Sequence, residues 1–150
     1  AEIVEILQKK GSDITKDTDL GAPDETLLSE IYDQPLFITE WPAHIKAFYM
    51  KRHPEKPGVV LAADLMAPEA YGELIGGSQR EENYEALVER MKEENISQEE
   101  FSWFLDLRKQ GSVPHSGFGF GLERLVSWMS GVKHIRETIP FPRMLNRMRP

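Results

Sequence analysis

The stretch HSGFGFGLERLVSWMSG, residues 115–131, says most about the fold of this chain. Glycines at 117, 119 and 121 alternate with two phenylalanines, and the pattern then changes to that of an amphipathic helix. Because glycine weakens a strand, three glycines at a spacing of two need a reason. A strand that lacks side chains on one face offers a flat floor for a nucleotide. Alternatively, the glycines make room for the helix to pack tightly across the strand.

The helix after this strand carries Arg124 in its first turn, beside the end of the helix dipole that favours anions. The glycine spacing is neither that of a Walker loop nor that of a dinucleotide-binding turn. If the strand binds a nucleotide, it therefore does so in another way.

Composition places the 150 residues in one domain of a soluble globular class, with 40% hydrophobic and 29% charged residues. The longest apolar runs are too short for a membrane span, and the absence of cysteine fits a reducing cytoplasm. A net charge of −7 argues against a generic nucleic-acid binder. The last 20 residues are basic, which suits either a phosphate contact or a solvated terminus; they hold Lys133, Arg136, Arg143, Arg147 and Arg149 against Glu137.

Hydrophobic periodicity predicts an α+β fold, an antiparallel β-sheet with flanking helices. Helices are expected at 2–10, from an N-cap at Asp24, around 84–91, from a capping box at Ser97 and at 122–130. Strands are expected at 35–41, 44–50, 59–67, 71–78 and 116–121.

The hairpin at 59–79 brings two carboxylates together. If Pro68 and Glu69 are its two turn residues, Asp64 stands directly opposite Glu73. Like charges in that arrangement destabilise a sheet and call for a compensating cation, and two carboxylates without a nearby histidine suit Mg²⁺ that carries substrate phosphates. The alternative is a slipped register that leaves one carboxylate in solvent.

The segment LIGGSQRE follows Glu73 directly. Gly76 and Gly77 allow a ligand to approach the backbone, and Arg80 offers a fork of donors for a carboxylate or phosphate. On local grounds a β-bulge and a surface arginine explain the same residues.

Taken together, these segments resemble a known family. GFGFGLERL is similar to motif 3 of the class II aminoacyl-tRNA synthetases, and DLMAPEAYGELIGGSQRE and HIRETIPFPR resemble segments of the asparaginyl and aspartyl branch. HIKAFYM, GGSQRE and WFLDLRKQGSVPHSGFG are closer to the asparaginyl members. The resemblance covers nearly the whole chain and is weakest over residues 1–34.

The resemblance implies a class II catalytic core, present in part, that uses ATP and Mg²⁺ to convert asparagine to an aminoacyl-adenylate and then charges tRNA(Asn). Asp64 and Glu73 would hold the metal, with Glu73 and Arg124 as the catalytic residues. Gly76 and Arg80 would bind the amino acid. The ATP-binding residues would be Glu73, Gly119, Gly121, Leu122, Glu123 and Arg124.

Motif 1, motif 2 with its α-phosphate arginine and the anticodon-binding barrel of the family are absent from these residues. We therefore expect residues 1–150 to be the C-terminal part of a catalytic domain, with the hairpin at 59–79 and motif 3 at 117–131. The whole enzyme is expected to be a cytoplasmic homodimer without membrane contact, and the part alone to be inactive. The alternatives are part of an aspartyl enzyme, or a free-standing synthetase-like protein that is an asparagine-forming ligase or a non-catalytic interaction module.

Overall fold

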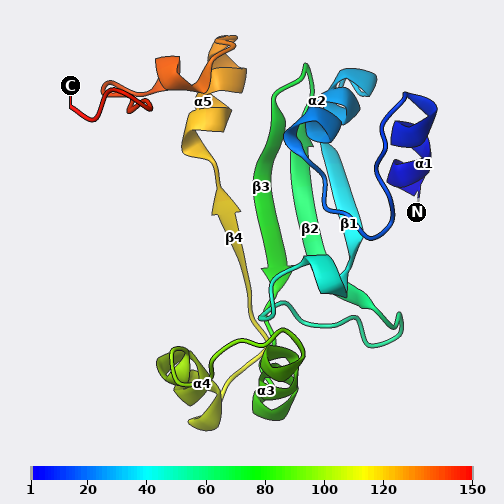
Figure 1. Ribbon diagram of the computed structural model, residues 1–150, viewed down its shortest axis with the longest axis vertical. Coiled ribbons are helices and arrows are strands. Elements are labelled where there is room, and N and C mark those ends of the chain that lie inside the picture. Colours follow the sequence, from blue (N-terminus) through cyan, green and yellow to red (C-terminus); the bar gives the residue numbers. More distant parts are fainter. Residues whose placement is uncertain (1, 150) are drawn as a thin grey trace.

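A computed structural model describes residues 2–149 and contains one four-stranded antiparallel sheet of order β1-β2-β3-β4 (Figure 1). The α+β prediction is therefore confirmed. The strands are β1 (Leu36–Pro42), β2 (Val59–Ala67), β3 (Gly72–Gln79) and β4 (Ser116–Phe120). The helices are α1 (Glu2–Lys9), α2 (Ala22–Ile31), α3 (Tyr84–Glu93), α4 (Ser102–Lys109) and α5 (Leu122–Ser130), with short 3₁₀ turns at Ala43–Ile45 and Ile135–Thr138.

The main core lies between one face of the sheet and helices α1 and α2; α2 lies over one end of the sheet, and α1 packs beside α2 near the β1 edge (Figure 1). Alternate residues of β2 point into this core, among them Val60 and Met66, and they meet Leu7 of α1 and Leu28 of α2. Asp64 has the same parity along β2, so its side chain also lies on this face.

A second, smaller core joins α3 and α4 beyond the other end of the sheet (Figure 1). Phe48 packs edge-on against Phe101 and Phe104 there, with ring centroids 5.1 and 6.0 Å apart. Because the chain enters α3 directly from β3 and returns from α4 into β4, this unit also fixes where the glycine-rich strand begins.

The predicted strand at 44–50 is wrong. Residues 43–45 form a 3₁₀ turn, and the chain then runs to an isolated bridge between Met50 and Arg80. Buried Arg90 explains part of the difference, because its Nη2 donates to the carbonyls of Ala43 and Lys46. A side chain thus takes acceptors that a strand would offer to a neighbouring strand.

Two helix starts also differ from the prediction. Helix α2 has Gly21 as its N-cap, while Asp24 sits three residues later and accepts the Gly21 N–H at 3.4 Å. Ser97 does accept the Glu100 N–H at 3.4 Å, but an intervening turn delays α4 to Ser102.

Strand β4 pairs only with β3 among the described residues and leads through Gly121 into α5. Helix α5 keeps the predicted bounds of 122–130, and Gly131 ends it in the left-handed conformation with φ of 70°. Within residues 2–149, none of the helices has the length and apolar character needed to cross a membrane.

Candidate functional site

Asp64 of β2 and Glu73 of β3 form an acidic pair, but not in the predicted register. Asp64 is paired with Gly76, and Glu73 is paired with Met66. The expectation that the two carboxylates stand directly opposite each other is therefore wrong.

The error lies in the reversal between the two strands. Four residues, 68–71, connect β2 to β3 instead of two, and Glu69 and Ala70 both have positive φ, at 60° and 65°. A β-bulge then shifts the ladder between Leu65 and Met66, with Leu74 as the extra residue on β3. The bulge keeps Glu73 on the same face of the sheet as Asp64.

Gly76 provides the space in which the two carboxylates meet. A Cβ at this position would lie 2.7 Å from Glu73 Oε1 and 3.3 Å from Asp64 Oδ1. The first separation is too short for a relaxed contact, so a side chain here would force the Glu73 carboxylate to move. Both carboxylates therefore lie over one glycine, close enough for one cation to contact both.

Burial raises the pKa of both carboxyl groups. Asp64 is only 5% exposed, and desolvation by burial is the main cause that raises its pKa. Desolvation also raises the pKa of Glu73, and the negative charges of Asp64 and Glu25 raise it further. Positive charge nearby is needed to keep the pair ionised.

Lys46 supplies such a charge, although the sequence analysis did not identify it. Its Nζ lies 3.1 Å from Asp64 Oδ2 and 3.3 Å from Asp19 Oδ1, and its side chain is 14% exposed. The same nitrogen sits 3.7 Å from the centroid of the Trp41 ring. Lys46 engages one oxygen of Asp64, while the other faces Gly76 and Glu73.

Arg124, in the first turn of α5, reaches back to the acidic pair. Its Nη1 donates to the backbone carbonyl of Glu73 and lies 3.8 Å from Glu25 Oε2. The side chains of Leu122 and Glu123, beside it in the same turn, are exposed. Arg124 and Glu73, predicted separately from the sequence, are thus in contact.

The glycines of β4 lie on the same face as the acidic pair, since Gly119 pairs with Gly76. Apart from its chain neighbours, no heavy atom of residues 2–149 lies within 4 Å of the place that a Cβ on Gly119 would take. A Cβ on Gly121 would instead touch the aliphatic stem of Arg124 at 3.5 Å. The backbone of Gly119 is therefore uncovered on this face, while the absence of a side chain at Gly121 leaves room for Arg124.

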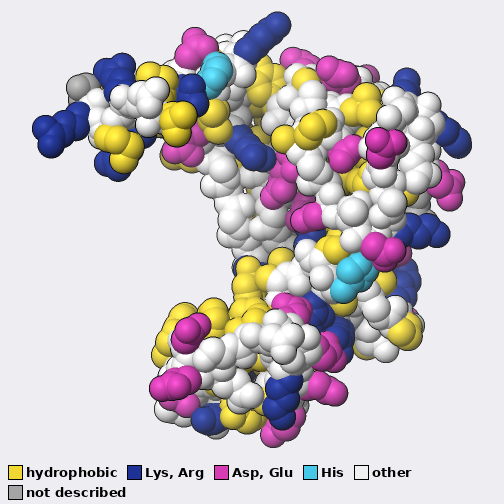
Figure 2. All heavy atoms as spheres, viewed as in Figure 1, with side chains coloured by type: hydrophobic (Ala, Val, Ile, Leu, Met, Phe, Trp, Pro, Cys, Tyr) yellow, Lys and Arg dark blue, Asp and Glu magenta, His cyan; other side chains and the backbone are white. Residues whose placement is uncertain are grey.

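Figure 2 shows this face of the molecule hollowed between the C-terminal segment at upper left and the α3–α4 unit below. The floor of the hollow is largely white, the colour of backbone and of uncharged polar side chains, with acidic and basic side chains at its upper end. The hollow gives access to the exposed surface of β4.

Arg80 lies at the other end of the same glycine strand. Its Nη1 donates to the hydroxyl of Ser78, and its guanidinium lies over the Tyr49 ring, 4.9 Å from the centroid. A Cβ on Gly117 would be 3.0 Å from Arg80 Nη2. The arginine predicted from GGSQRE is thus held in place by three neighbours.

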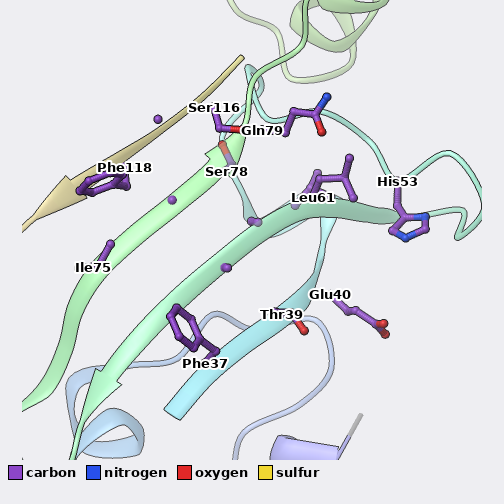
Figure 3. A pocket seen from close by; sticks show the side chains of 15 residues that line it. Phe37, Thr39, Glu40, His53, Leu61, Ile75, Ser78, Gln79, Ser116 and Phe118 are labelled. Carbon is purple, nitrogen blue, oxygen red and sulfur yellow. The ribbon is translucent and has the colours of Figure 1, made fainter. Parts of the chain in front are cut away.

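A separate hollow of about 770 Å³ lies on the opposite face of the sheet (Figure 3). Phe37, Ile75 and Phe118 line it together with Leu61, and Phe118 is 70% exposed. By the alternation of side chains along β2 and β3, this face is not the one that carries Asp64. This hollow, lined mainly by apolar side chains, is therefore distinct from the charged site.

The acidic pair could hold a magnesium ion. Magnesium commonly takes one or two protein carboxylates and completes its shell with water and phosphate oxygens. Across residues 2–149 no cluster of three or more His, Cys, Asp or Glu residues is arranged for a metal. Asp64 and Glu73, converging over Gly76, therefore fit a metal that arrives with phosphates better than a fully protein-bound one.

Lys46 and Glu25 are the site residues that the sequence analysis missed. Two neighbouring carboxylates require a compensating positive charge, and Lys46 supplies some of it. No spacing rule connects Lys46 to Asp64, because 18 positions and a turn-rich loop separate them. Glu25 had only the weak signal of an acidic residue in the first turn of a helix.

Comparison with known proteins agrees with this geometry. Residues 3–145 match the family described as tRNA synthetases class II (D, K and N). The chain is 56% identical over 149 residues to an asparagine--tRNA ligase of Pelotomaculum thermopropionicum, covering 99% of this chain and 35% of that protein.

Solved structures of synthetases also match nearly the whole of this chain. Asparaginyl-tRNA synthetase from Pyrococcus horikoshii, in complex with asparaginyl-adenylate, matches 99% of this chain and 34% of its own with a TM-score of 0.93 and 52% identity. Aspartyl tRNA synthetase from Entamoeba histolytica matches 99% of this chain and 31% of its own with a TM-score of 0.90 and 28% identity. The chain spans about a third of the length of these relatives. The match over residues 3–145, together with the glycine strand and the acidic pair, shows that the chain belongs to the class II tRNA synthetases of the D, K and N group.

Proposed function

We propose that this chain supplies the ATP-binding and asparagine-binding part of the catalytic site of an asparagine--tRNA ligase. The observation that carries the proposal is the convergence of Asp64 and Glu73 over Gly76, beside the open backbone of Gly119 and next to Arg124. Relatives 52–56% identical over 149 residues bear the name asparagine--tRNA ligase.

The reaction has two steps. A carboxylate oxygen of asparagine attacks the α-phosphorus of ATP, the bond to the bridging oxygen breaks, and pyrophosphate leaves. A hydroxyl of the terminal ribose of tRNA(Asn) then attacks the carbonyl carbon of the adenylate, and AMP leaves. Both steps need positioning and charge stabilisation more than a protein base.

Asp64 and Glu73 would hold a Mg²⁺ ion, which neutralises phosphate charge when bound. Glu73 also fixes Arg124 through its carbonyl, so one residue serves the metal and the nucleotide. Lys46 keeps positive charge at the buried side of Asp64.

Arg124 would stack its guanidinium plane on the adenine and contact the terminal phosphate, which a lysine cannot reproduce. Gly119 and Gly121, followed by Leu122 and Glu123, would form the surface on which ATP lies. Among the described residues, no atom outside the chain neighbours lies within 4 Å of the Cβ position of Gly119, so the planar adenine base has room there.

Arg80 and Gly76 would receive the amino acid. Arg80 uses one nitrogen on Ser78, so other donors of its fork are available to a substrate oxygen. We place the reaction in the cytoplasm, with tRNA(Asn) as the acceptor and a homodimer as the assembly of the whole enzyme.

Amino-acid-dependent pyrophosphate exchange tests the proposal, run on the natural polypeptide that contains these residues. We expect exchange that depends on Mg²⁺ and asparagine, and at most about a hundredth of that rate with aspartate, since a site built for one hydrogen-bonding partner rejects another. Exchange with aspartate alone would assign the chain to the aspartyl enzymes. No exchange with either would favour a non-catalytic module, a conclusion that a natural reading frame of about 150 codons would strengthen.

A further inference from the structure

We infer that Gly117 is a positioning residue for amino-acid recognition, because it leaves room for the Arg80 guanidinium against the backbone of β4. Gly117 and Gly119 of this strand then serve different ends of the substrate. The inference rests on the proposed function, because it assumes that Arg80 contacts asparagine. It adds a role for Gly117 that packing of the sheet does not require.

The first observation is how closely Arg80 approaches the strand. A Cβ on Gly117 would lie 3.0 Å from Nη2, 3.4 Å from Nε and 3.6 Å from Cζ of Arg80. All three atoms belong to one guanidinium group, so its plane covers the position where any other residue would carry a side chain.

The second observation is that Arg80 is fixed from its other sides. Ser78, 6% exposed and paired with Gly117 across the ladder, accepts a hydrogen bond from Nη1. The Tyr49 ring lies 4.9 Å from Cζ of the arginine. The backbone N–H of Arg80 donates to the carbonyl of His115 at 2.9 Å, which fixes the base of the side chain.

These contacts leave the guanidinium little room to move away from an added methyl group. To relieve a 3.0 Å contact, Arg80 must shift by some tenths of an ångström and weaken either its bond to Ser78 or its contact with Tyr49. The end of a flexible side chain can make this shift at small cost to the fold. Hydrogen bonds to a substrate depend much more steeply on position.

The neighbouring glycines provide the contrast. Among residues 2–149, no atom other than those of its chain neighbours lies within 4 Å of a Cβ placed on Gly119. A Cβ placed on Gly121 would contact the aliphatic part of the Arg124 side chain. An alanine at 117 therefore disturbs the amino-acid end of the strand, and an alanine at 119 intrudes on the surface proposed for ATP. The two substitutions are chemically identical and two residues apart on one face.

The test compares Gly117→Ala and Gly119→Ala in the natural polypeptide that contains this chain, with binding of asparagine and of ATP–Mg²⁺ measured separately by equilibrium titration. We expect Gly117→Ala to weaken asparagine about tenfold and ATP less than twofold, with the opposite pattern for Gly119→Ala. Unfolding curves accompany each variant, and both are expected to stay folded. Equal loss of both ligands, or unchanged asparagine binding in Gly117→Ala, would overturn the inference.

Arg80→Lys separates this inference from the proposed function. If Gly117 acts through Arg80, then adding Gly117→Ala to Arg80→Lys weakens asparagine less than twofold further, because the fork is already lost. A full additional tenfold loss would mean that the methyl blocks the substrate directly, and the inference fails. If Arg80→Lys itself leaves asparagine binding unchanged, the role proposed for Arg80 is wrong.

Discussion

Replacing Lys46 with methionine should destabilise the fold strongly, and more at high pH than at low pH. The substitution removes the ammonium group 3.1 Å from Asp64 Oδ2 and 3.7 Å from the Trp41 ring centroid, while it keeps an apolar stem of similar length. Asp64 is 5% exposed, so its carboxylate would be left buried with its closest cation gone.

Removing one partner of a buried ion pair typically costs about 3–5 kcal/mol, and a cation–π contact contributes about 0.5–2 kcal/mol. Lys46 is 14% exposed and Asp64 can take up a proton, and both facts reduce the loss. We therefore expect about 2–4 kcal/mol near pH 8.

The sign of the pH dependence follows from the pKa of Asp64, which burial raises above its value in the unfolded chain even with Lys46 present. A group with a raised pKa in the folded state favours folding when protonated, and that contribution is lost as pH rises through the folded pKa. Without Lys46 this pKa rises further. The cost of the substitution should therefore be smaller at about pH 5 than at about pH 8, because protonation of Asp64 becomes more favourable as pH falls.

Urea unfolding followed by tryptophan fluorescence measures this free energy at both pH values. Lys51→Met is the control and should cost less, because Lys51 pairs with Glu82 instead of Asp64 and these two side chains are more exposed, at 25% and 20%. Lys46→Met combined with Asp64→Asn should regain much of the loss, since no buried charge is then left unpaired. A cost below about 0.5 kcal/mol at pH 8, or one independent of pH, would refute the reasoning.

Three further predictions concern the site. Asp64→Asn in the natural polypeptide should weaken Mg²⁺-dependent adenylate formation more than asparagine binding, as seen by pyrophosphate exchange and titration; equal losses would mean that the carboxylate does not serve a metal. Arg124→Lys should raise the KM for ATP about tenfold with an unchanged unfolding curve, because an ammonium does not stack on a base; unchanged ATP kinetics would mean that the glycine strand serves packing. Gly76→Ala should displace the Glu73 carboxylate and strongly reduce exchange at little cost in urea unfolding, because the new methyl would lie 2.7 Å from Glu73 Oε1, the end of a flexible side chain; unchanged exchange would contradict the metal role proposed for Glu73.

The sequence predicted best those features that depend on local pattern. Strands 59–67 and 116–121 and the helix that Gly131 ends follow from periodicity and from the conformational freedom of glycine, and the structure contains all three. The open face of β4 also follows from alternation alone, because Gly117, Gly119 and Gly121 must share one side.

Features that depend on distant partners could not be predicted. The left-handed Glu69 and Ala70 and the bulge at Leu74 change the pairing of the hairpin without changing its hydrophobic pattern. Residues 44–50 are rich in apolar and aromatic residues, as strands are, yet Arg90 of a later helix donates to the carbonyls of Ala43 and Lys46. Lys46 reaches Asp64 only because of that local path.

A crystal structure of the natural polypeptide that contains this chain, with a non-hydrolysable asparaginyl-adenylate analogue, tests most directly which face of the sheet is catalytic. We expect the adenine against Arg124 above Gly119, and the asparagine side chain within hydrogen-bonding distance of Arg80. An analogue bound instead in the apolar hollow of the opposite face, between Phe37 and Phe118, would contradict the central claim that the glycine-floored face is the catalytic one.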